Sequence, residues 1–207
     1  MVIRPYDMEK KEKSKNASAA GYIAAGLLVM LLFGITLMNF IYFRYGNEDT
    51  FDEIIAEKAA AVGVDPLLIK AIIKRESQFK FRCVGSKGEV GLMQLMPGAI
   101  RDWEEANDKP YHLKNELFAP ELNIEIGSWY FARALRQWQN SANPEAYALA
   151  QYNAGRGNLL KWVKKSGKGS DYNKVVAFPS TRKYIAVILE SYKDYKAEES
   201  EKNGKKN

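Results

Sequence analysis

The stretch DPLLIKAIIKRESQF, residues 65–79, predicts a helix that carries an unusual acid. Asp65 is a favourable N-cap residue, and Pro66 suits the first helical position, where its missing N–H leaves no hydrogen bond unmade. We expect this helix to run to about Ser77. Residues spaced by three, one and three positions lie on one face of a helix. The apolar stripe of this helix therefore ends on a glutamate, and its members are Ile69, Ile72, Ile73 and Glu76.

The position of Glu76 favours a protonated carboxyl. Burial on the apolar side raises the pKa of a carboxyl because the charged form loses solvation, and the C-terminal end of a helix disfavours an anion. The positive charge of Arg75 acts in the opposite direction. A raised pKa is what a general acid needs. Spacing alone leaves two interpretations: a catalytic acid, or a solvated charge at a frayed helix end that pairs with a lysine.

An uncharged segment, residues 17–43, precedes this region. As a helix it would be about 40 Å long at ~1.5 Å per residue, whereas a bilayer core needs roughly 20 residues. It is too long for the core of a signal peptide, and no small-x-small cleavage site follows it. The segment therefore predicts an uncleaved transmembrane signal-anchor.

The charges on either side of the segment predict its orientation. Basic residues come before it and acidic residues follow, so residues 1–16 are expected to form a cytoplasmic basic tail. The protein is then expected to cross the cell membrane once, with everything from residue 44 onward outside the cytoplasm. The basic residues are Arg4, Lys10, Lys11, Lys13 and Lys15, the acids are Glu48, Asp49, Asp52 and Glu53, and the aromatic residues expected at the outer interface are Tyr42, Phe43 and Tyr45.

The exported part is organised as a short linker, residues 44–50, a catalytic domain, residues 51–195, and a charged, flexible tail, residues 196–207. Almost all of its patterns are helical. The predicted helix starts are a capping box at Thr50 and Glu53, the pair Asn143-Pro144, and Thr181; the predicted stops are Gly63, Gly155 and Gly157.

A long helix is expected over residues 121–139, with Ile126, Tyr130, Ala134 and Trp138 at four-residue spacing. Strand signals are scarce, and only the glycine-rich residues 83–91 suit a small hairpin or loop. The predicted fold class is mainly α, preceded by one transmembrane helix.

Composition narrows the chemistry. The formal net charge is +6, which fits either an anionic surface or polymer as a neighbour or a mildly basic soluble surface. The single cysteine, Cys83, excludes an intrachain disulfide, and we expect it to be inert. The single histidine, His112, lies in a polar loop, so neither a Cys/His zinc cluster nor a histidine-based triad is expected. No phosphate-binding glycine loop is present, and we expect no nucleic-acid partner.

Further motifs follow the glutamate in a particular order. They are ESQF at 76–79, GLMQLMP at 91–97, NIEIGSWYFARAL at 123–135, AQYNAG at 150–155 and RKYIAVIL at 182–189. Together they resemble the soluble-lytic-transglycosylase domain of the goose-lysozyme-like glycosidase family, over about residues 52–195. The resemblance implies a lysozyme-like helical fold with a long groove. It also implies cleavage of the β-1,4 bond between N-acetylmuramic acid and N-acetylglucosamine in a peptidoglycan glycan strand.

The resemblance also assigns roles by motif. Glu76 matches the sole catalytic acid and base, Ser77 is expected to orient the site, and Met93 and Gln94 are expected to meet the sugar through a packing face and an amide. The full set of implied substrate-binding residues is Ser77, Gly91, Leu92, Met93, Gln94, Tyr152, Asn153 and Tyr184. Simpler roles stay open, since Met93, Leu95 and Met96 could be core residues and Asn153 only a helix-end residue.

Ordinary glycosidases use two carboxylates, and the nearby candidates for a second one are Glu89, Asp102, Glu104 and Glu105. None matches a catalytic position of the family, and the last three are expected on a solvated helix face. The family therefore implies a single-acid route that forms a 1,6-anhydro ring without water, metal or cofactor. The alternatives are a hydrolytic muramidase, a catalytically silent wall-binding scaffold, and an anchor that recruits cell-wall synthesis or envelope machinery.

Overall fold

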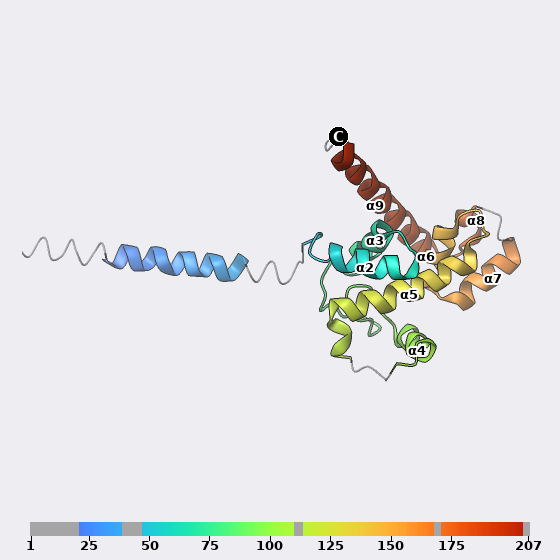
Figure 1. Ribbon diagram of the computed structural model, residues 1–207, viewed down its shortest axis with the longest axis horizontal. Helices are drawn as coiled ribbons and strands as arrows, with labels where there is room; N and C mark the ends of the chain where they lie inside the picture. Colours follow the sequence, from blue (N-terminus) through green and yellow to red (C-terminus); the bar gives the residue numbers. More distant parts are fainter. Residues whose placement is uncertain (1–20, 39–46, 110–113, 168–170, 205–207) are drawn as a thin grey trace, which may run out of the picture. The chain divides into compact units, whose positions relative to one another are not determined.

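The apolar segment near the N-terminus forms a helix in the computed structural model of the protein. The structure describes residues 21–38, 47–109, 114–167 and 171–204. The helix spans Gly21–Met38 (Figure 1). Its side chains are exposed, its mean hydropathy is 2.2, and it is long and apolar enough to cross a bilayer. It agrees with the centre of the predicted anchor. The predicted ends of the span, residues 17–20 and 39–43, lie outside the described residues, as do His112 and the interfacial aromatic residues.

The chain divides into two units, and the second begins at Gly46. This second unit is built from helices and loops, which confirms the predicted fold class. In the described residues its β-structure is limited to two isolated antiparallel bridges, within and beside the predicted hairpin: Val84 with Val90, and Val90 with Leu95. The helices are α2 (Asp52–Val62), α3 (Pro66–Ser77), α4 (Pro97–Ala106), the 3₁₀ helix η1 (Glu116–Phe118), α5 (Pro120–Trp138), α6 (Pro144–Ala154), α7 (Arg156–Ser166), α8 (Tyr172–Val175) and α9 (Pro179–Gly204).

The predicted limits of α3 are correct, and those of α2 are nearly so. The Asp65 carboxylate accepts from the Leu67 N–H at 2.9 Å, as an N-cap should, and Pro66 follows at the first helical position. Gly63 ends α2 in the left-handed region, at φ 71°. The predicted capping box is wrong, however, because Phe51 is the N-cap of α2 and makes no side-chain cap bond.

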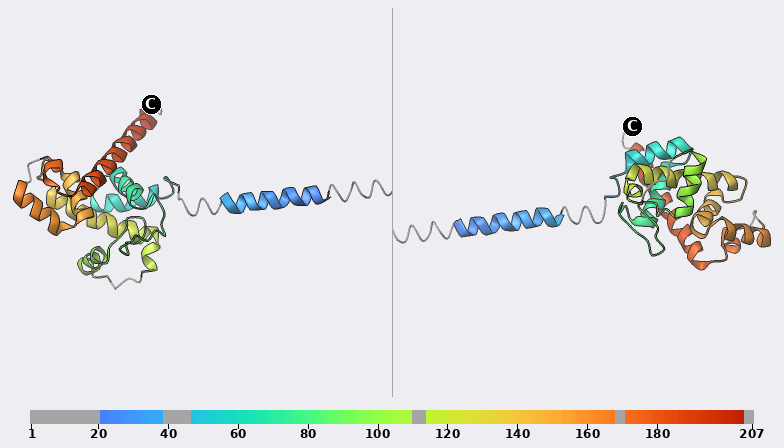
Figure 2. Two further views of the ribbon diagram at one scale, coloured as in Figure 1. Left: turned by 180° about the vertical axis from the view of Figure 1, so that it is seen from behind. Right: turned by 90° about the horizontal axis from the view of Figure 1, so that it is seen from below.

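Later boundaries differ more from the prediction. Gly157 does not stop a helix. Helix α7 begins at Arg156, directly after Gly155, and includes Gly157. Thr181 does not cap α9, which begins two residues earlier at a proline. The predicted frayed tail from residue 196 is helical through Gly204, and this end of α9 extends away from the other helices in both Figure 1 and the left view of Figure 2.

Helix α5 lies at the centre of the domain and packs against α2, α4, α6 and η1, whereas α9 packs against α3 and α6 (Figure 1). The predicted stripe on α5 is mainly core: Ile126, Ala134 and Trp138 are buried. Tyr130, the fourth member, is only partly buried and lies on a cavity wall. The α5 stripe therefore connects the hydrophobic core to the candidate site.

One buried amide holds the loop between α3 and α4 against α5. Asn123, in the first turn of α5, is fully buried, and its Oδ1 accepts from the Met93 N–H at 2.8 Å. Its Nδ2 donates to the carbonyls of Val90, at 3.0 Å, and Leu117, at 2.8 Å. A single side chain thus gives a partner to the Met93 N–H of the loop and to the Leu117 carbonyl of η1. It also adds a second donor to the Val90 carbonyl, which accepts from the Leu95 N–H at 2.9 Å.

Gly91 makes this contact possible. Its φ is +79°, and a Cβ placed on it would lie 2.1 Å from the Asn123 Nδ2. Any side chain would therefore be strained by the backbone and would displace the amide. The glycine of the GLMQ motif is explained by this close approach to α5.

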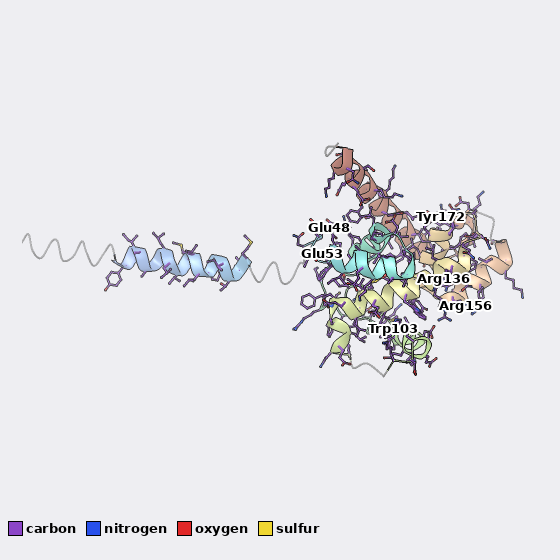
Figure 3. The ribbon with its side chains drawn as sticks, in the orientation of Figure 1. Glu48, Glu53, Trp103, Arg136, Arg156 and Tyr172 are labelled. Carbon is purple, nitrogen blue, oxygen red and sulfur yellow. The ribbon has the colours of Figure 1, made fainter. Side chains whose placement is uncertain are left out.

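The first described residues of the domain bind to α3 through ion pairs. Glu48, labelled in Figure 3, lies 2.7 Å from the Lys74 Nζ, and Asp49 lies 2.9 Å from the Lys70 Nζ. Residues 47–50, predicted to be linker, are therefore part of the folded domain, and the predicted boundary at residue 50 is too late. Pairing with lysines explains why acids stand here.

We predict that Asn123→Ala lowers the free energy of unfolding by about 3–4 kcal/mol, because it leaves the buried Met93 N–H and Leu117 carbonyl without their partners and removes a second donor from the Val90 carbonyl. The measurement is chemical denaturation of the purified protein. Ser128→Ala on the same helix is the control: the Ser128 hydroxyl is buried and has no hydrogen-bond partner among the described residues, so its loss should be neutral or stabilising. Equal stability of the two variants would contradict the role given to Asn123.

Candidate active site

Glu76 lies in the last turn of α3, where it is half-buried at the end of the apolar stripe. The Tyr184 hydroxyl, from α9, donates to the Glu76 Oε1 at 2.6 Å. Tyr184 is buried, with 2% of its surface exposed. The packing of α9 against α3 therefore brings together two residues that are far apart in sequence, and this agrees with the place expected for Tyr184.

Burial raises the pKa of the Glu76 carboxyl above its ordinary value, because the charged form loses hydration. The Tyr184 hydrogen bond and the positive charge of Arg75 lower this pKa, while the negative charge of Glu89 raises it. The net effect is upward, as the apolar stripe predicts. The raised pKa increases the protonated fraction of Glu76 at a given pH, which suits a proton donor.

Two neutral tyrosines interact with the acid, Tyr184 through its hydrogen bond and Tyr152 through the charge of Glu76. The Tyr152 hydroxyl donates to the Met93 carbonyl at 2.9 Å, and its ring makes edge contacts with Tyr130, at 5.9 Å between centroids, and Phe131, at 6.2 Å. Burial, followed by the charge of Glu76, raises the pKa of both Tyr152 and Tyr184 well above the ordinary value. Both hydroxyls therefore stay protonated at neutral pH.

The GLMQ segment enters the core more deeply than predicted. Leu92 and Met93 are fully buried, and Met93 packs against Gly127 of α5, where an added Cβ would lie 2.3 Å from its sulfur. Their side chains have no exposed surface in this structure, and this burial does not support the sugar contacts of Leu92 and Met93, which stay a prediction. The Asn123 bond to the Met93 N–H explains this inward direction.

Gln94, expected to offer an amide to the sugar, uses the donor end of that amide within the loop. Its φ is +48°, and its Nε2 donates to the carbonyls of Gly91, at 2.8 Å, and Cys83, at 3.3 Å. The amide hydrogens thus hold the loop together, and the carbonyl oxygen is left to accept a hydrogen bond. Cys83 is half-buried and contributes its backbone here.

The remaining predicted residues differ in their exposure. Ser77 is buried, and its hydroxyl donates to the Ile73 carbonyl of its own helix at 3.2 Å, so its orienting role stays a prediction. Asn153, near the end of α6, is exposed, and its Oδ1 accepts from the Thr181 hydroxyl at 2.8 Å. Thr181 was predicted only as a cap, and its pattern in sequence gave no sign of this contact.

A cavity of about 440 Å³ is lined by part of the site, and Glu76 and Tyr184 are not among its lining residues. Among the predicted residues, Gln94, Tyr152 and Asn153 line it together. Two further lining residues, Met96 and Tyr130, were not assigned to the site by sequence, and Met96 is 43% exposed. An exposed methionine and a half-buried tyrosine on a cavity wall are suitable surfaces for a sugar ring.

The candidate second carboxylates are in different surroundings. Glu89 accepts from the Lys87 N–H at 2.8 Å and raises the pKa of Glu76 through its charge. Asp102 lines the cavity and pairs with Arg133, with 2.9 Å between oxygen and nitrogen. Glu104 is buried, which corrects the predicted solvated face of α4; it follows the buried Trp103 that Figure 3 labels.

Metal-binding side chains do not gather in this part of the chain. In the ranges that the structure describes, His, Cys, Asp and Glu form no group of three or more that could hold an ion. The groups at the site are a carboxyl, phenols, amides and aromatic surfaces, which suit proton transfer and hydrogen bonding to a polar polymer.

The family model for the transglycosylase SLT domain matches residues 53–175. The chain is 32% identical over 123 residues to the soluble lytic murein transglycosylase of Salmonella typhimurium, across 58% of this chain and 19% of that protein. It is 30% identical over 134 residues to the membrane-bound lytic murein transglycosylase C of Yersinia pestis, across 62% of this chain and 36% of that protein. The chain thus spans well under half the length of both relatives.

The fold is similar to a solved structure from Pseudomonas aeruginosa, the lytic transglycosylase Slt in an inactive mutant in which a glutamate is replaced by glutamine. The TM-score is 0.61 at 26% identity, covering 73% of this chain and 24% of the other. The matched family model covers α2 to α8, and with them the loop and helices that carry Glu76, Gln94 and Tyr152. The chain belongs to the transglycosylase SLT domain family.

Proposed function

We propose that this domain is a lytic transglycosylase that cleaves the β-1,4 bond between N-acetylmuramic acid and N-acetylglucosamine in peptidoglycan. Glu76 is its single acid and base, and the product is a 1,6-anhydromuramic end. One observation carries this proposal: a half-buried carboxyl with a raised pKa receives a 2.6 Å hydrogen bond from a buried tyrosine, close to residues that line an open cavity.

The relatives add independent support. Two are named for lytic murein transglycosylase activity, and a third of known structure is inactive as a glutamate-to-glutamine mutant. Because this chain spans only part of each, the reaction itself is inferred from the site. A carboxyl with a raised pKa suits the protonation of a leaving oxygen at a pH where ordinary glutamates are ionised.

The reaction begins with protonated Glu76, which gives its proton to the glycosidic oxygen. The bond from that oxygen to the muramic acid C1 breaks, and the substrate's own N-acetyl group stabilises the oxocarbenium-like centre, as in substrate-assisted glycosidases. The Glu76 carboxylate then takes the proton of the C6 hydroxyl, whose oxygen bonds to C1 and closes the ring. The proton returns to Glu76, and no water is consumed.

The surrounding groups hold the acid and the sugar. Tyr184 fixes one oxygen of Glu76, which leaves the other to face the substrate. On the cavity wall, Gln94, Tyr152 and Asn153 orient the glycan strand, so that the scissile oxygen lies within reach of the acid. This route needs no metal and no cofactor.

A hydrolytic muramidase is the second candidate, and Glu89 favours it. Its charge acts on Glu76, so the two carboxyls belong to one electrostatic site. A carboxylate that activates water would make the product one water heavier. One oxygen of Glu89 already accepts from the Lys87 N–H in the loop. We therefore place this route second to the one in which the C6 hydroxyl is the nucleophile and no water is needed.

We further propose that the N-terminal helix anchors the domain in the cell membrane, with the N-terminus in the cytoplasm. Basic residues precede this helix, and a relative is named as membrane-bound. Glu48 is already bound to α3, so about five residues separate the predicted end of the span from the domain, a reach of at most roughly 18 Å. Cleavage would occur close to the membrane, which suits a role beside wall-synthesis or envelope-spanning machinery.

We predict that Glu76→Gln lowers the release of soluble fragments from purified sacculi by about 10²–10⁴-fold, the usual contribution of a general acid. Mass analysis of the products should show anhydro ends for the unmodified protein. Glu105→Gln, an exposed acid on α4, is the matched control and should retain full activity.

Three outcomes would decide against this proposal in different ways. Full activity of Glu76→Gln would exclude Glu76 as the acid. Products one water heavier would identify a muramidase. Binding to sacculi with no product from the unmodified protein would identify a wall-binding scaffold.

We predict opposite pH shifts for two neighbours of the acid. Activity should fall as pH rises through the pKa of Glu76, because the donor must be protonated. Tyr184→Phe removes a bond that lowers this pKa, so the alkaline limb of kcat/KM should move to higher pH. Glu89→Gln removes a charge that raises it, so the limb should move to lower pH. Shifts in the same direction, or a limb that neither variant moves, would contradict the assignment of the acid.

A further inference from the structure

Thr181 is a buried polar residue that the proposed reaction does not use. It lies in the first turn of α9, with 1% of its surface exposed, and its hydroxyl donates to the Asn153 Oδ1 at 2.8 Å. Asn153 is exposed and lines the cavity. We propose that Thr181 is a positioning residue, which fixes the Asn153 amide so that its Nδ2 donates a hydrogen bond to an oxygen of the bound glycan.

The surroundings of Thr181 determine which end of the amide faces α9. The first N–H groups of a helix lack partners within the helix and give its N-terminus a partial positive charge. This end therefore attracts the carbonyl oxygen of Asn153 and repels its NH₂ group. The Thr181 hydroxyl needs an acceptor there, and the Oδ1 supplies it. The Nδ2 is left on the other side of the amide, with no hydrogen-bond partner among the described residues.

An oriented amide is useful in a sugar site, because an asparagine that is free to rotate presents donor and acceptor equally. Gln94, on the same cavity, is fixed in the opposite sense, since its Nε2 binds loop carbonyls and its oxygen remains available. The cavity wall thus includes an amide fixed with its donor free, at Asn153, and an amide fixed with its acceptor free, at Gln94, whose oxygen lies beside Gly85. An N-acetyl group, which carries one carbonyl and one N–H, has the complementary pair.

This inference rests on the proposed function for the identity of the ligand, but its test does not need turnover. The probe is a peptidoglycan tetrasaccharide of alternating N-acetylglucosamine and N-acetylmuramic acid, and its Kd is measured by calorimetry on the full chain carrying Glu76→Gln. In that background, Thr181→Val keeps the branched shape but removes the hydroxyl. We expect the Kd to rise about ten-fold, the value of one hydrogen bond. Thr181→Ser, which keeps the hydroxyl, should rescue binding.

Coupling to Asn153 separates positioning from simple packing. In an Asn153→Ala background, Thr181→Val should have no further effect on the Kd, because the amide that it orients is gone. In the active chain, Thr181→Val should raise KM more than it lowers kcat, as expected for a group that binds the ground state and transition state alike. Ser180→Ala, an exposed neighbour, is the matched control and should leave both constants unchanged.

The inference is overturned if Thr181→Val binds as well as the parent chain, if its effect persists in full in the Asn153→Ala background, or if Thr181→Ser fails to rescue. Should Thr181→Val not fold, Asn153→Asp decides, because it retains the Oδ1 bonded to Thr181 and replaces the donor with a second oxygen. Unchanged binding by Asn153→Asp would overturn the inference, and weakened binding would support it. Binding with these effects but without product from the active chain would instead reject the proposed reaction.

Discussion

The buried amide of Asn123 is the interaction on which the candidate site depends. The loop between α3 and α4 has no regular sheet to pair its backbone, yet it must carry Gln94 to the cavity and the Met93 carbonyl to Tyr152. Asn123 supplies partners to the Met93 N–H and the Leu117 carbonyl, and it adds a second donor to the Val90 carbonyl, which already accepts from the Leu95 N–H. Gly91 admits the amide because it has no side chain, and Gly127 admits the buried Met93. Close contacts with α5 thus fix where the backbone and side chains of this loop lie.

Opposing effects set the pKa of the Glu76 carboxyl. Burial at the end of an apolar stripe favours the neutral carboxyl, whereas the Tyr184 hydroxyl and the Arg75 charge favour the anion. A single acid and base must occupy both states during one turnover, so a strong preference for either would slow a step. Helix α9 contributes to the site at two points, because Tyr184 donates to the acid and Thr181 donates to Asn153, which lines the cavity. Its packing therefore sets the geometry around the reaction.

Local patterns predict what depends on local physics. The N-cap at Asp65, the left-handed end at Gly63 and the burial of Glu76 follow from spacing and backbone preference, and the structure confirms them. What spacing could not predict were contacts between distant segments. Thr181 has the pattern of a cap, but the packing of α9 on α6 turns its hydroxyl toward Asn153. The resemblance implies that Met93 packs on a sugar, because its motif lines the groove in the family. In the structure Met93 packs in the core, in space that is open because Gly127 has no side chain.

The most direct test of Glu76 as a proton donor is the titration of its carboxyl. Carbon-13 NMR of the full chain with labelled glutamate, assigned by the signal that Glu76→Gln removes, reports its pKa without a substrate. We predict a midpoint above the ordinary glutamate pKa of about 4.3, and a further rise of this midpoint in Tyr184→Phe. A midpoint at or below the ordinary value, unmoved by loss of the tyrosine hydroxyl, would contradict the claim that burial prepares this residue to donate a proton.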